Sequence, residues 1–284
     1  MRDTGMREIH IDDITAAIER LFIDANINLS GNMYAAIKDA IDREASPVGK
    51  EVLRELLRNA DVAREEKMPI CQDTGLAVAF LEIGQDTHIT GGDLSEAVSE
   101  GVRRAYRNGY LRKSCCHPFT RKNTGDNTPP IVHIKIVPGD RLKVTVLPKG
   151  GGSENYGEVR MLTPSQGKEG VRAFILEMVR KGGPNPCPPI TVGIGIGGNF
   201  EMSALLSKEA LMVPPGERST DPEMADLERE ILEEINRTGI GPQGYGGTVT
   251  ALDVHIKMAP CHLASLPVAV NIQCHAHRMK EAVL

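Results

Sequence analysis

The segment Lys67–Gly75 places several functional groups of different chemistry next to one another. Its sequence, Lys-Met-Pro-Ile-Cys-Gln-Asp-Thr-Gly, supplies a soft ligand at Cys71, an amide at Gln72, a carboxylate at Asp73 and a hydroxyl at Thr74. The proline before these residues and the glycine after them predict a loop, and the apolar run that follows predicts a buried strand. Loops held by a rigid strand commonly carry binding and catalytic residues. A surface turn that contains one buried cysteine is the simpler alternative.

The cysteines fit a metal site better than a disulfide framework. Six cysteines in 284 residues are too sparse for the scaffold of a small secreted domain. Four of them are predicted in loops or at strand ends: Cys71, Cys187, Cys261 and Cys274. Nearby proline and glycine suit an iron–sulfur cluster, whereas zinc is the competing metal although no Cys-x2-Cys pair occurs. Adjacent Cys115 and Cys116 are poorly arranged to ligate one cluster, and spacing alone does not choose between Cys261 and Cys274.

Three glycine-rich loops offer backbone N–H groups to an anion. They are Gly150–Gly152, Gly193–Gly198 and Gly244–Gly247. The middle loop resembles a dinucleotide fingerprint, but its glycines begin inside a predicted strand and no acidic residue closes the following strand. We therefore favour close backbone approach, with free N–H groups directed at an anionic substrate or at cluster sulfides. Ordinary tight turns are the alternative.

Cations and histidines complete the set of candidate site residues. The long polar loop at 111–130 contains three cations: Arg112, Arg121 and Lys122. Guanidinium groups bind carboxylates in bidentate fashion, which would suit a dicarboxylic acid, although lone loop arginines are more often solvated. Three histidines lie near the two C-terminal cysteines: His262, His275 and His277. Each is more often a hydrogen-bonded neighbour of a site than a ligand.

Hydrophobic periodicity predicts a mixed α/β fold with a helical N-terminal third and mixed sheets. Three helices are expected within 12–66, and later helices at 93–108, 167–180, 200–211 and 221–236. Strands are expected at 76–83, 191–196, 268–272 and in the stretch ending at Lys257. The alternating runs 131–137 and 142–147, separated by Pro-Gly-Asp, predict a β-hairpin. We expect one domain over 1–284, with a helical part at 1–66 and an α/β core at 67–284.

Composition excludes several classes of function. The net charge is −5 and the charges are interspersed, so no basic footprint for nucleic acid is present. Aromatic residues are only 4% and tryptophan is absent, which argues against base-stacking platforms and carbohydrate grooves. No apolar run approaches the roughly 18–20 residues that span a bilayer. The polar N-terminus, Met1–Ile11, lacks the apolar core of a signal peptide, so we expect a cytoplasmic protein without membrane or nucleic-acid partners.

The motifs, taken together, resemble the iron–sulfur hydro-lyases, the class I fumarases and L-tartrate dehydratases. The resemblance extends in the right order over nearly the whole chain. The segments that carry it are Pro69–Gly75, Asn123–Pro129, Lys149–Asn155, Asn185–Pro189, Gly195–Gly198 and Cys274–Arg278. More narrowly, the chain is similar to the alpha subunit of the two-subunit form.

This resemblance implies a [4Fe–4S] cluster held by three cysteines, with one iron left open as a Lewis acid for the substrate hydroxyl and carboxylate. The ligands that it implies are Cys71, Cys187 and Cys274, which resolves in favour of Cys274 the choice that spacing left open. The core at 67–284 would then be the cluster-binding part of the domain.

The same resemblance implies how the substrate is held. It assigns Gln72 and Asp73 to the substrate, with Asp73 as candidate proton donor to the departing hydroxyl. Arg112 matches the position that clamps a substrate carboxylate. Backbone contacts are expected from Gly151 or Gly152, and a site-proximal histidine of uncertain role is expected at His262.

Single-chain members of the family continue into a second domain that supplies further arginines, a lysine and the proposed catalytic base. Because this sequence ends at Leu284, we expect a separate beta subunit to complete the active site, in an α2β2 assembly. The expected reaction is hydration of fumarate to L-malate, and dehydration of L-tartrate to oxaloacetate is the alternative. Two rivals from other classes are an electron-transfer protein, for which Cys261 would be the fourth ligand, and a zinc-bound structural or regulatory subunit.

Overall fold

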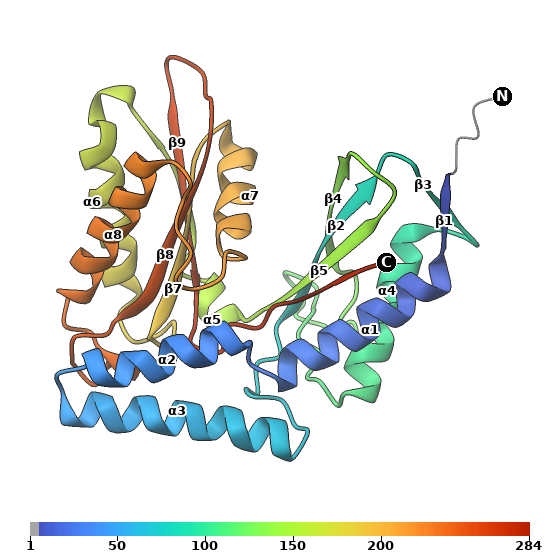
Figure 1. The fold of residues 1–284 in the computed structure, drawn as a ribbon, viewed down its shortest axis with the longest axis horizontal. Coiled ribbons are helices and arrows are strands. Elements are labelled where there is room, and N and C mark those ends of the chain that lie inside the picture. The colour runs from blue at the N-terminus through green and yellow to red at the C-terminus, as the bar shows by residue number, and fades with distance from the viewer. Residues whose placement is uncertain (1–5) are drawn as a thin grey trace. The chain divides into compact units, whose positions relative to one another are not determined.

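The structure, a computed structural model, describes residues 6–284, and its internal contacts divide the chain into two units (Figure 1). Met1–Gly5, part of the predicted polar N-terminus, lie outside the described residues. Unit 1 comprises the described residues up to Ser30, then Ala60–Gly151 and Arg278–Leu284. Unit 2 comprises Gly31–Asn59 and Gly152–His277.

Unit 1 is a four-stranded sheet with helices on one face. The strand order is β10-β5-β2-β4, with β2 at Leu76–Gly84, β4 at Ile131–Val137, β5 at Leu142–Lys149 and β10 at Lys280–Val283. The helices α1 (Ile11–Ile27) and α4 (Leu94–Asn108) pack on each other, and their apolar faces share one core with the sheet. Short strands β1 (Arg7–His10) and β3 (Thr87–Thr90) form a separate parallel pair. Asp93 caps α4 as predicted, because its side chain accepts a hydrogen bond from the Glu96 N–H at 2.8 Å.

The predicted β-hairpin at 131–147 is wrong, although both of its strands exist. Strand β2 lies between them, parallel to β4 and antiparallel to β5. Strand β2 is apolar and buried along most of its length, so it takes the central position and leaves β4 at the edge. The Pro-Gly-Asp turn wraps around the end of β2, where Gly84 N–H donates to the Arg141 carbonyl at 2.8 Å and Asp86 N–H donates to the Gly139 carbonyl at 2.9 Å.

Unit 2 is a second four-stranded sheet, covered by helices on both faces. The order is β6-β9-β7-β8, with β6 at Glu158–Leu162, β7 at Ile190–Gly197, β8 at Ala251–Ala259 and β9 at Leu266–Gln273. Figure 1 shows α6 (Gly167–Gly182) and α8 (Pro222–Asn236) on one face and α7 (Phe200–Ala210) on the other. Helix α2 (Gly31–Arg43) belongs to this unit, as does most of α3 (Pro47–Glu65), while the single turn α5 (Gly151–Glu154) follows β5.

The glycines of β7 serve helix packing. A Cβ atom at Gly193 would lie 2.2 Å from the Ser207 carbonyl oxygen, and one at Gly195 would lie 2.0 Å from the Ser203 carbonyl oxygen. Helix α7 therefore lies directly on the backbone of β7. The expectation of close backbone approach is confirmed, but the neighbour is a helix. Both glycines lie within the β8 and β9 ladders, so the expectation that their N–H groups face an anion is wrong.

The two sheets share one pattern of connections. In each, the central strand (β2 or β7) is parallel to the next strand of its sheet along the chain (β4 or β8) and antiparallel to the one after that (β5 or β9). The start of the central strand therefore lies beside the end of the antiparallel strand. We call this edge of each sheet the entry edge. In unit 1 it is marked by the pair Leu76↔Lys149, and in unit 2 by the pair Thr191↔Gln273.

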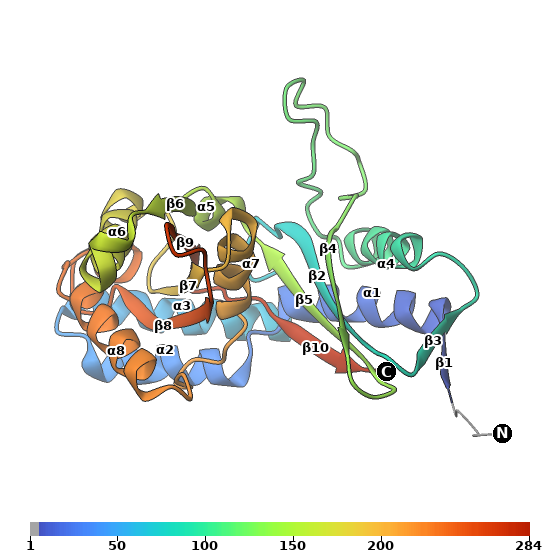
Figure 2. The same cartoon turned by 90° about the horizontal axis from the view of Figure 1, so that it is seen from above.

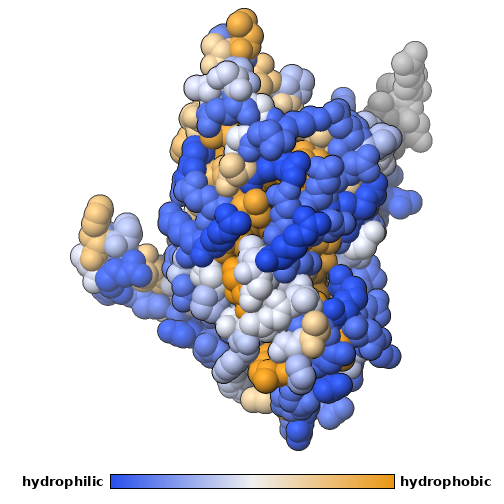
Figure 3. All heavy atoms as spheres, turned by 90° about the vertical axis from the view of Figure 1, so that its left-hand side faces the viewer, coloured by the Kyte–Doolittle hydropathy of each residue, from blue (hydrophilic) through white to orange (hydrophobic). Residues whose placement is uncertain are grey.

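The mixed α/β class and the three N-terminal helices are confirmed. The contact boundaries do not follow the predicted division at residue 66, because α1 packs into the core of unit 1 whereas α2 belongs to unit 2. A single functional domain over 1–284 stays a prediction. Within the described residues, no helix is long and apolar enough to cross a membrane. The face of unit 2 formed by α6 and α8 is largely hydrophilic (Figure 3).

Candidate functional site

The Cys71 loop lies at the entry edge of unit 1, immediately before β2. As predicted, Cys71–Gly75 has no regular secondary structure. The Cys71 thiol is free and partly exposed, and Gln72 is exposed. The Cys71 Sγ atom lies 3.5 Å from Gln72 Oε1. A soft ligand and an amide are therefore presented side by side from one loop.

Two buried side chains fix the end of this loop. The hydroxyl of Tyr106, a fully buried residue of α4, lies 2.9 Å from the carbonyl oxygens of both Thr74 and Gly75. The Asn127 amide donates to the Gly75 carbonyl at 3.2 Å, and its oxygen accepts from the Ser114 N–H at 2.6 Å. Burial raises the pKa of Tyr106 far above its ordinary value, and the nearby positive charge of Arg278 opposes this only in part. The phenol therefore remains a donor throughout the range in which proteins are studied.

Asp73 joins the loop to the glycine segment that follows β5. Its Oδ1 accepts from the Gly75 N–H at 3.0 Å and its Oδ2 accepts from the Gly151 N–H at 2.8 Å. Gly75 has a φ of 77°, and a Cβ atom there would lie 2.6 Å from the Lys149 carbonyl carbon. Only glycine fits this turn, which brings the Cys71 loop against the end of β5.

Unit 1 thus gathers several of the predicted substrate contacts. Thr74 Oγ1 donates to the Arg112 carbonyl at 2.9 Å, so the start of the polar loop lies against the Cys71 loop, and the Arg112 side chain is exposed. Gln72 and Gly151 are also exposed. Figure 2 shows the segment between α4 and β4 projecting beyond the rest of unit 1, and Phe119 within it is 89% exposed.

Cys187 and Cys274 both lie at the entry edge of unit 2. Cys187 precedes β7 and Cys274 follows β9 directly. The His275 N–H donates to the Cys187 carbonyl at 3.4 Å, so the two cysteine-bearing segments touch. Cys187 has a φ of 57°, an uncommon backbone conformation for a residue other than glycine. Such conformations persist where the surroundings fix them, often at functional sites.

Gln243 holds these two segments together, and sequence reasoning missed it. Its backbone N–H and its side-chain amide both donate to the Pro188 carbonyl, at 2.7 Å and 2.6 Å. The same amide nitrogen lies 3.1 Å from His275 Nδ1. The third glycine loop packs on the same place, because a Cβ atom at Gly244 would lie 2.3 Å from Pro184 Cβ. The only sequence signal was a polar residue inside that glycine loop.

Cys261 and His262 lie at the opposite end of unit 2. They belong to the connection between β8 and β9, and the eight-residue strand β9 separates this connection from Cys274 by roughly 25 Å. His262 is exposed, and with Cys261 it lines an apolar groove of about 370 Å³ that also includes Met258 and Leu263. Unit 2 therefore brings Cys187 together with Cys274 and separates both from Cys261 and His262. Topology favours Cys274 where spacing could not choose.

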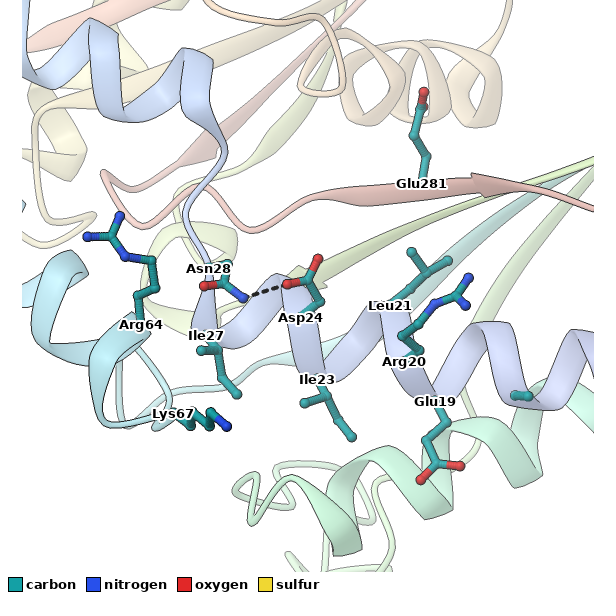
Figure 4. Close-up of a pocket in the computed structure, with 11 residues that line it drawn as sticks. Glu19, Arg20, Leu21, Ile23, Asp24, Ile27, Asn28, Arg64, Lys67 and Glu281 are labelled. Atoms are coloured by element: carbon teal, nitrogen blue, oxygen red, sulfur yellow. Dashed lines mark hydrogen bonds between the residues drawn. The ribbon is translucent and has the colours of Figure 1, made fainter.

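A larger pocket, of about 830 Å³, lies elsewhere in unit 1. It is lined mainly by α1, together with Arg64, Lys67 and Glu281 (Figure 4). Asp24 in this pocket accepts a hydrogen bond from the Asn28 amide at 2.6 Å and pairs with Lys280 at 3.1 Å. None of the predicted ligands or substrate contacts lines it. Pocket volume and the predicted site residues therefore point to different parts of the molecule.

The chemistry of the donor set fits a cluster. None of the six cysteines forms a disulfide, and Cys71, Cys187 and Cys274 are each partly exposed at an entry edge. Thiolates are the ligands that iron–sulfur clusters use. Cys71 belongs to unit 1 and the other two to unit 2. Among the described residues, no three His, Cys, Asp or Glu side chains already surround a common metal position.

The buried Tyr106 contact leads to a stability prediction. Tyr106→Phe removes the only hydroxyl that reaches the Thr74 and Gly75 carbonyls from α4, so the free energy of unfolding should fall by about 1–3 kcal/mol. Tyr110→Phe is the matched control, because Tyr110 is 89% exposed and its change should stay within about 0.5 kcal/mol. Chemical denaturation of both variants checks this, and equal stability of the two would contradict the assigned role.

Comparison with known proteins identifies the family. The profile of the family described as Fumarate hydratase (Fumerase) matches residues 15–283. A protein of Methanocaldococcus jannaschii named "Putative L(+)-tartrate dehydratase subunit alpha" is 42% identical over 271 residues, covering 93% of this chain and 95% of that protein. The L(+)-tartrate dehydratase subunit alpha of Escherichia coli (strain K12) is 33% identical over 282 residues, covering 98% and 93%. This chain therefore belongs to the fumarate hydratase (Fumerase) family and is a hydro-lyase.

Proposed function

We propose that this chain is the cluster-bearing alpha subunit of a hydro-lyase that acts on a four-carbon dicarboxylate. The observation that supports this proposal is the arrangement of the Cys71 loop in a chain of the fumarate hydratase family. That loop presents a thiol and an amide next to each other, and Asp73 ties it to the Gly151 backbone. A reducing compartment such as the cytoplasm suits six cysteines that form no disulfide.

Cys71, Cys187 and Cys274 are the proposed ligands of a [4Fe–4S] cluster. The bound cluster would supply an open iron that acts as a Lewis acid on the substrate. The fixed backbone around Cys187, with Gln243 bridging to His275, supports the choice of the two ligands from unit 2. The position of Cys261 beyond the far end of β9 argues against it as a ligand.

The remaining roles fall to other residues of this chain. The exposed side-chain amide of Gln72 donates a hydrogen bond to the substrate, and Arg112 binds a substrate carboxylate. Asp73 gives a proton to the departing hydroxyl in the dehydration direction and recovers it in hydration. Hydrogen bonds from the N–H groups of Gly75 and Gly151 hold its carboxyl group in place. Gly151 or Gly152 adds backbone contacts, and His262 is kept as a candidate contact only.

A beta subunit completes the active site in this proposal, in an α2β2 assembly. Relatives that cover nearly all of this chain are named as alpha subunits, which supports a separate partner. The partner would supply the catalytic base and the remaining cations for the substrate carboxylates. This chain alone would then hold the cluster but turn over little substrate.

Fumarate hydration to L-malate is the first candidate reaction, in line with the description of the family. Dehydration of L(+)-tartrate to oxaloacetate is the second, and the names of the relatives from M. jannaschii and E. coli favour it. Both reactions break or form a C–O bond next to a carboxylate, so the residues of this chain serve either one. Contacts from the partner subunit would set the preference.

The proposed activity predicts a result for anaerobic co-expression with a candidate beta subunit. The complex should interconvert fumarate and L-malate or dehydrate L(+)-tartrate, while either subunit alone stays near background, because each holds part of the site. Assays on all three acids with the complex and with separate subunits check this. Activity of the alpha chain without a partner would overturn the proposal that two subunits share the active site. A complex that is inactive on all three acids would overturn the proposed dicarboxylate substrates for this pairing.

The ligand assignment makes a separate prediction. Cys71→Ser, Cys187→Ser and Cys274→Ser should each abolish retention of iron and sulfide, because each removes one of three thiolates. Cys115→Ser, Cys116→Ser and Cys261→Ser are matched controls that should retain the cluster. Iron and sulfide analysis of anaerobically purified variants decides this. Loss of the cluster in the Cys261 variant with retention in the Cys274 variant would refute the assignment.

A further inference from the structure

Arg278 is a buried cation at the entry edge of unit 1. It lies just before β10 and is only 2% exposed. Its Nη1 donates to the Asp73 carbonyl and lies 3.3 Å from Asn26 Oδ1. No carboxylate among the described residues forms an ion pair with it, and its Nε has no hydrogen-bond partner there. The guanidinium is thus held mainly by neutral acceptors.

Burying a guanidinium without an ionic partner lowers the stability of the folded protein. A buried charge without an ionic partner loses its hydration, and the effective penalty in proteins is several kcal/mol. An apolar residue of similar volume would often fill such a position at no loss of stability. Packing alone therefore does not explain an arginine here.

The contacts of Arg278 join three segments of unit 1. The first is the Asp73 peptide, through its carbonyl. The second is the end of α1, where Asn26 is fully buried and its backbone carbonyl accepts from the Ile70 N–H at 2.8 Å. The third is Gly150, where a Cβ atom would lie 3.0 Å from Arg278 Nη2 and 3.1 Å from Asp73 Oδ2. One guanidinium therefore contacts the Asp73 peptide and lies against Gly150, and it reaches the start of the Cys71 loop through Asn26.

We propose that Arg278 is a positioning residue that fixes Gln72 and Asp73 relative to the backbone of Gly150 and Gly151. It acts through the Asp73 peptide and leaves both Asp73 carboxylate oxygens to the N–H groups of Gly75 and Gly151. Its positive charge also lies near the Asp73 carboxylate, since one Cβ atom at Gly150 would approach both groups. The role in turnover rests on the proposed function, whereas the role in ordering the loop does not.

Three variants of the assembled two-subunit enzyme separate geometry from charge. Arg278→Met removes both, Arg278→Gln keeps a donor without the charge, and Arg278→Lys keeps the charge and a donor. We expect kcat per cluster to fall about 100-fold in Arg278→Met, because a displacement near 1 Å is enough for such a loss. Arg278→Lys should regain a substantial part of the lost kcat, and Arg278→Gln should regain less. In all three variants KM should change much less than kcat. Iron and sulfide content should stay close to that of the unaltered enzyme.

Hydrogen–deuterium exchange supplies the readout that does not depend on turnover. In Arg278→Met the amides of 69–76 should exchange faster, while α4 and the rest of β2, from Ala77 to Gly84, keep their protection. Arg160→Met is the matched control: Arg160 is a partly exposed arginine of unit 2 that pairs with Glu158 and Glu177, and its loss should change neither kcat nor exchange at 69–76. Unchanged exchange at 69–76 in Arg278→Met, or equal loosening of all of unit 1, would overturn the proposal.

The two proposals fail separately. If the unaltered complex converts none of the dicarboxylates, the proposed function is wrong and exchange at 69–76 alone decides the positioning role. If the complex is active but Arg278→Met retains full kcat per cluster, the positioning role is wrong and the proposed function stands.

Discussion

The arrangement of both halves of this protein depends on one constraint, the insertion of an apolar strand between two strands that follow it in the sequence. Strand β2 enters between β4 and β5, and β7 enters between β8 and β9. The start of the inserted strand must then lie beside the end of an antiparallel neighbour. Loops that are far apart in sequence meet there: the Cys71 loop with Gly150–Gly151 in unit 1, and Cys187 with Cys274 in unit 2.

The two entry edges are built with different kinds of contacts. In unit 1, side chains hold backbone: Tyr106, Asn127, Asp73 and Arg278 each bind peptide groups of the Cys71 loop or of the glycine segment beside it. In unit 2, the backbone around Cys187 is fixed by the proline-rich segment that contains it and by the hydrogen bond from Gln243 to the Pro188 carbonyl. Both solutions fix the backbone near a thiol while leaving the thiol partly exposed, which is compatible with the proposed role of these thiols as metal ligands.

Local patterns predicted the helices and most long strands because these elements follow from periodicity and caps. Asp93 as the cap of α4 and Pro47 as the start of α3 are examples. Strand pairing was not predictable in the same way. The Pro-Gly-Asp sequence is a strong hairpin signal. The competing apolar strand β2 ends at Gly84, 47 residues before β4 begins at Ile131, so the sequence near the turn gives no sign of it. The short strands β1, β3, β6 and β10 were missed because four or five residues are too few to show a distinctive pattern.

The sequence was enough to predict which residues belong to the candidate site, but not how these residues are arranged in space. The motifs and the family resemblance pointed to Cys71, Asp73 and Arg112, and unit 1 brings their segments together. Arg278 and Gln243 were missed as supporting residues because their partners are backbone carbonyls distant in sequence. His262 shows the converse, since nearness to Cys274 in sequence does not place it near Cys274 when β9 lies between them.

In the proposed function, three cysteines of this chain hold a four-iron cluster with one open iron. Electron paramagnetic resonance of the anaerobically reconstituted chain, before and after brief exposure to air, tests it most directly. A three-cysteine site should lose the iron that has no protein ligand and give the signal of a [3Fe–4S] cluster. A four-iron cluster that survives air intact, or a chain that binds zinc and no iron or sulfide, would contradict the account.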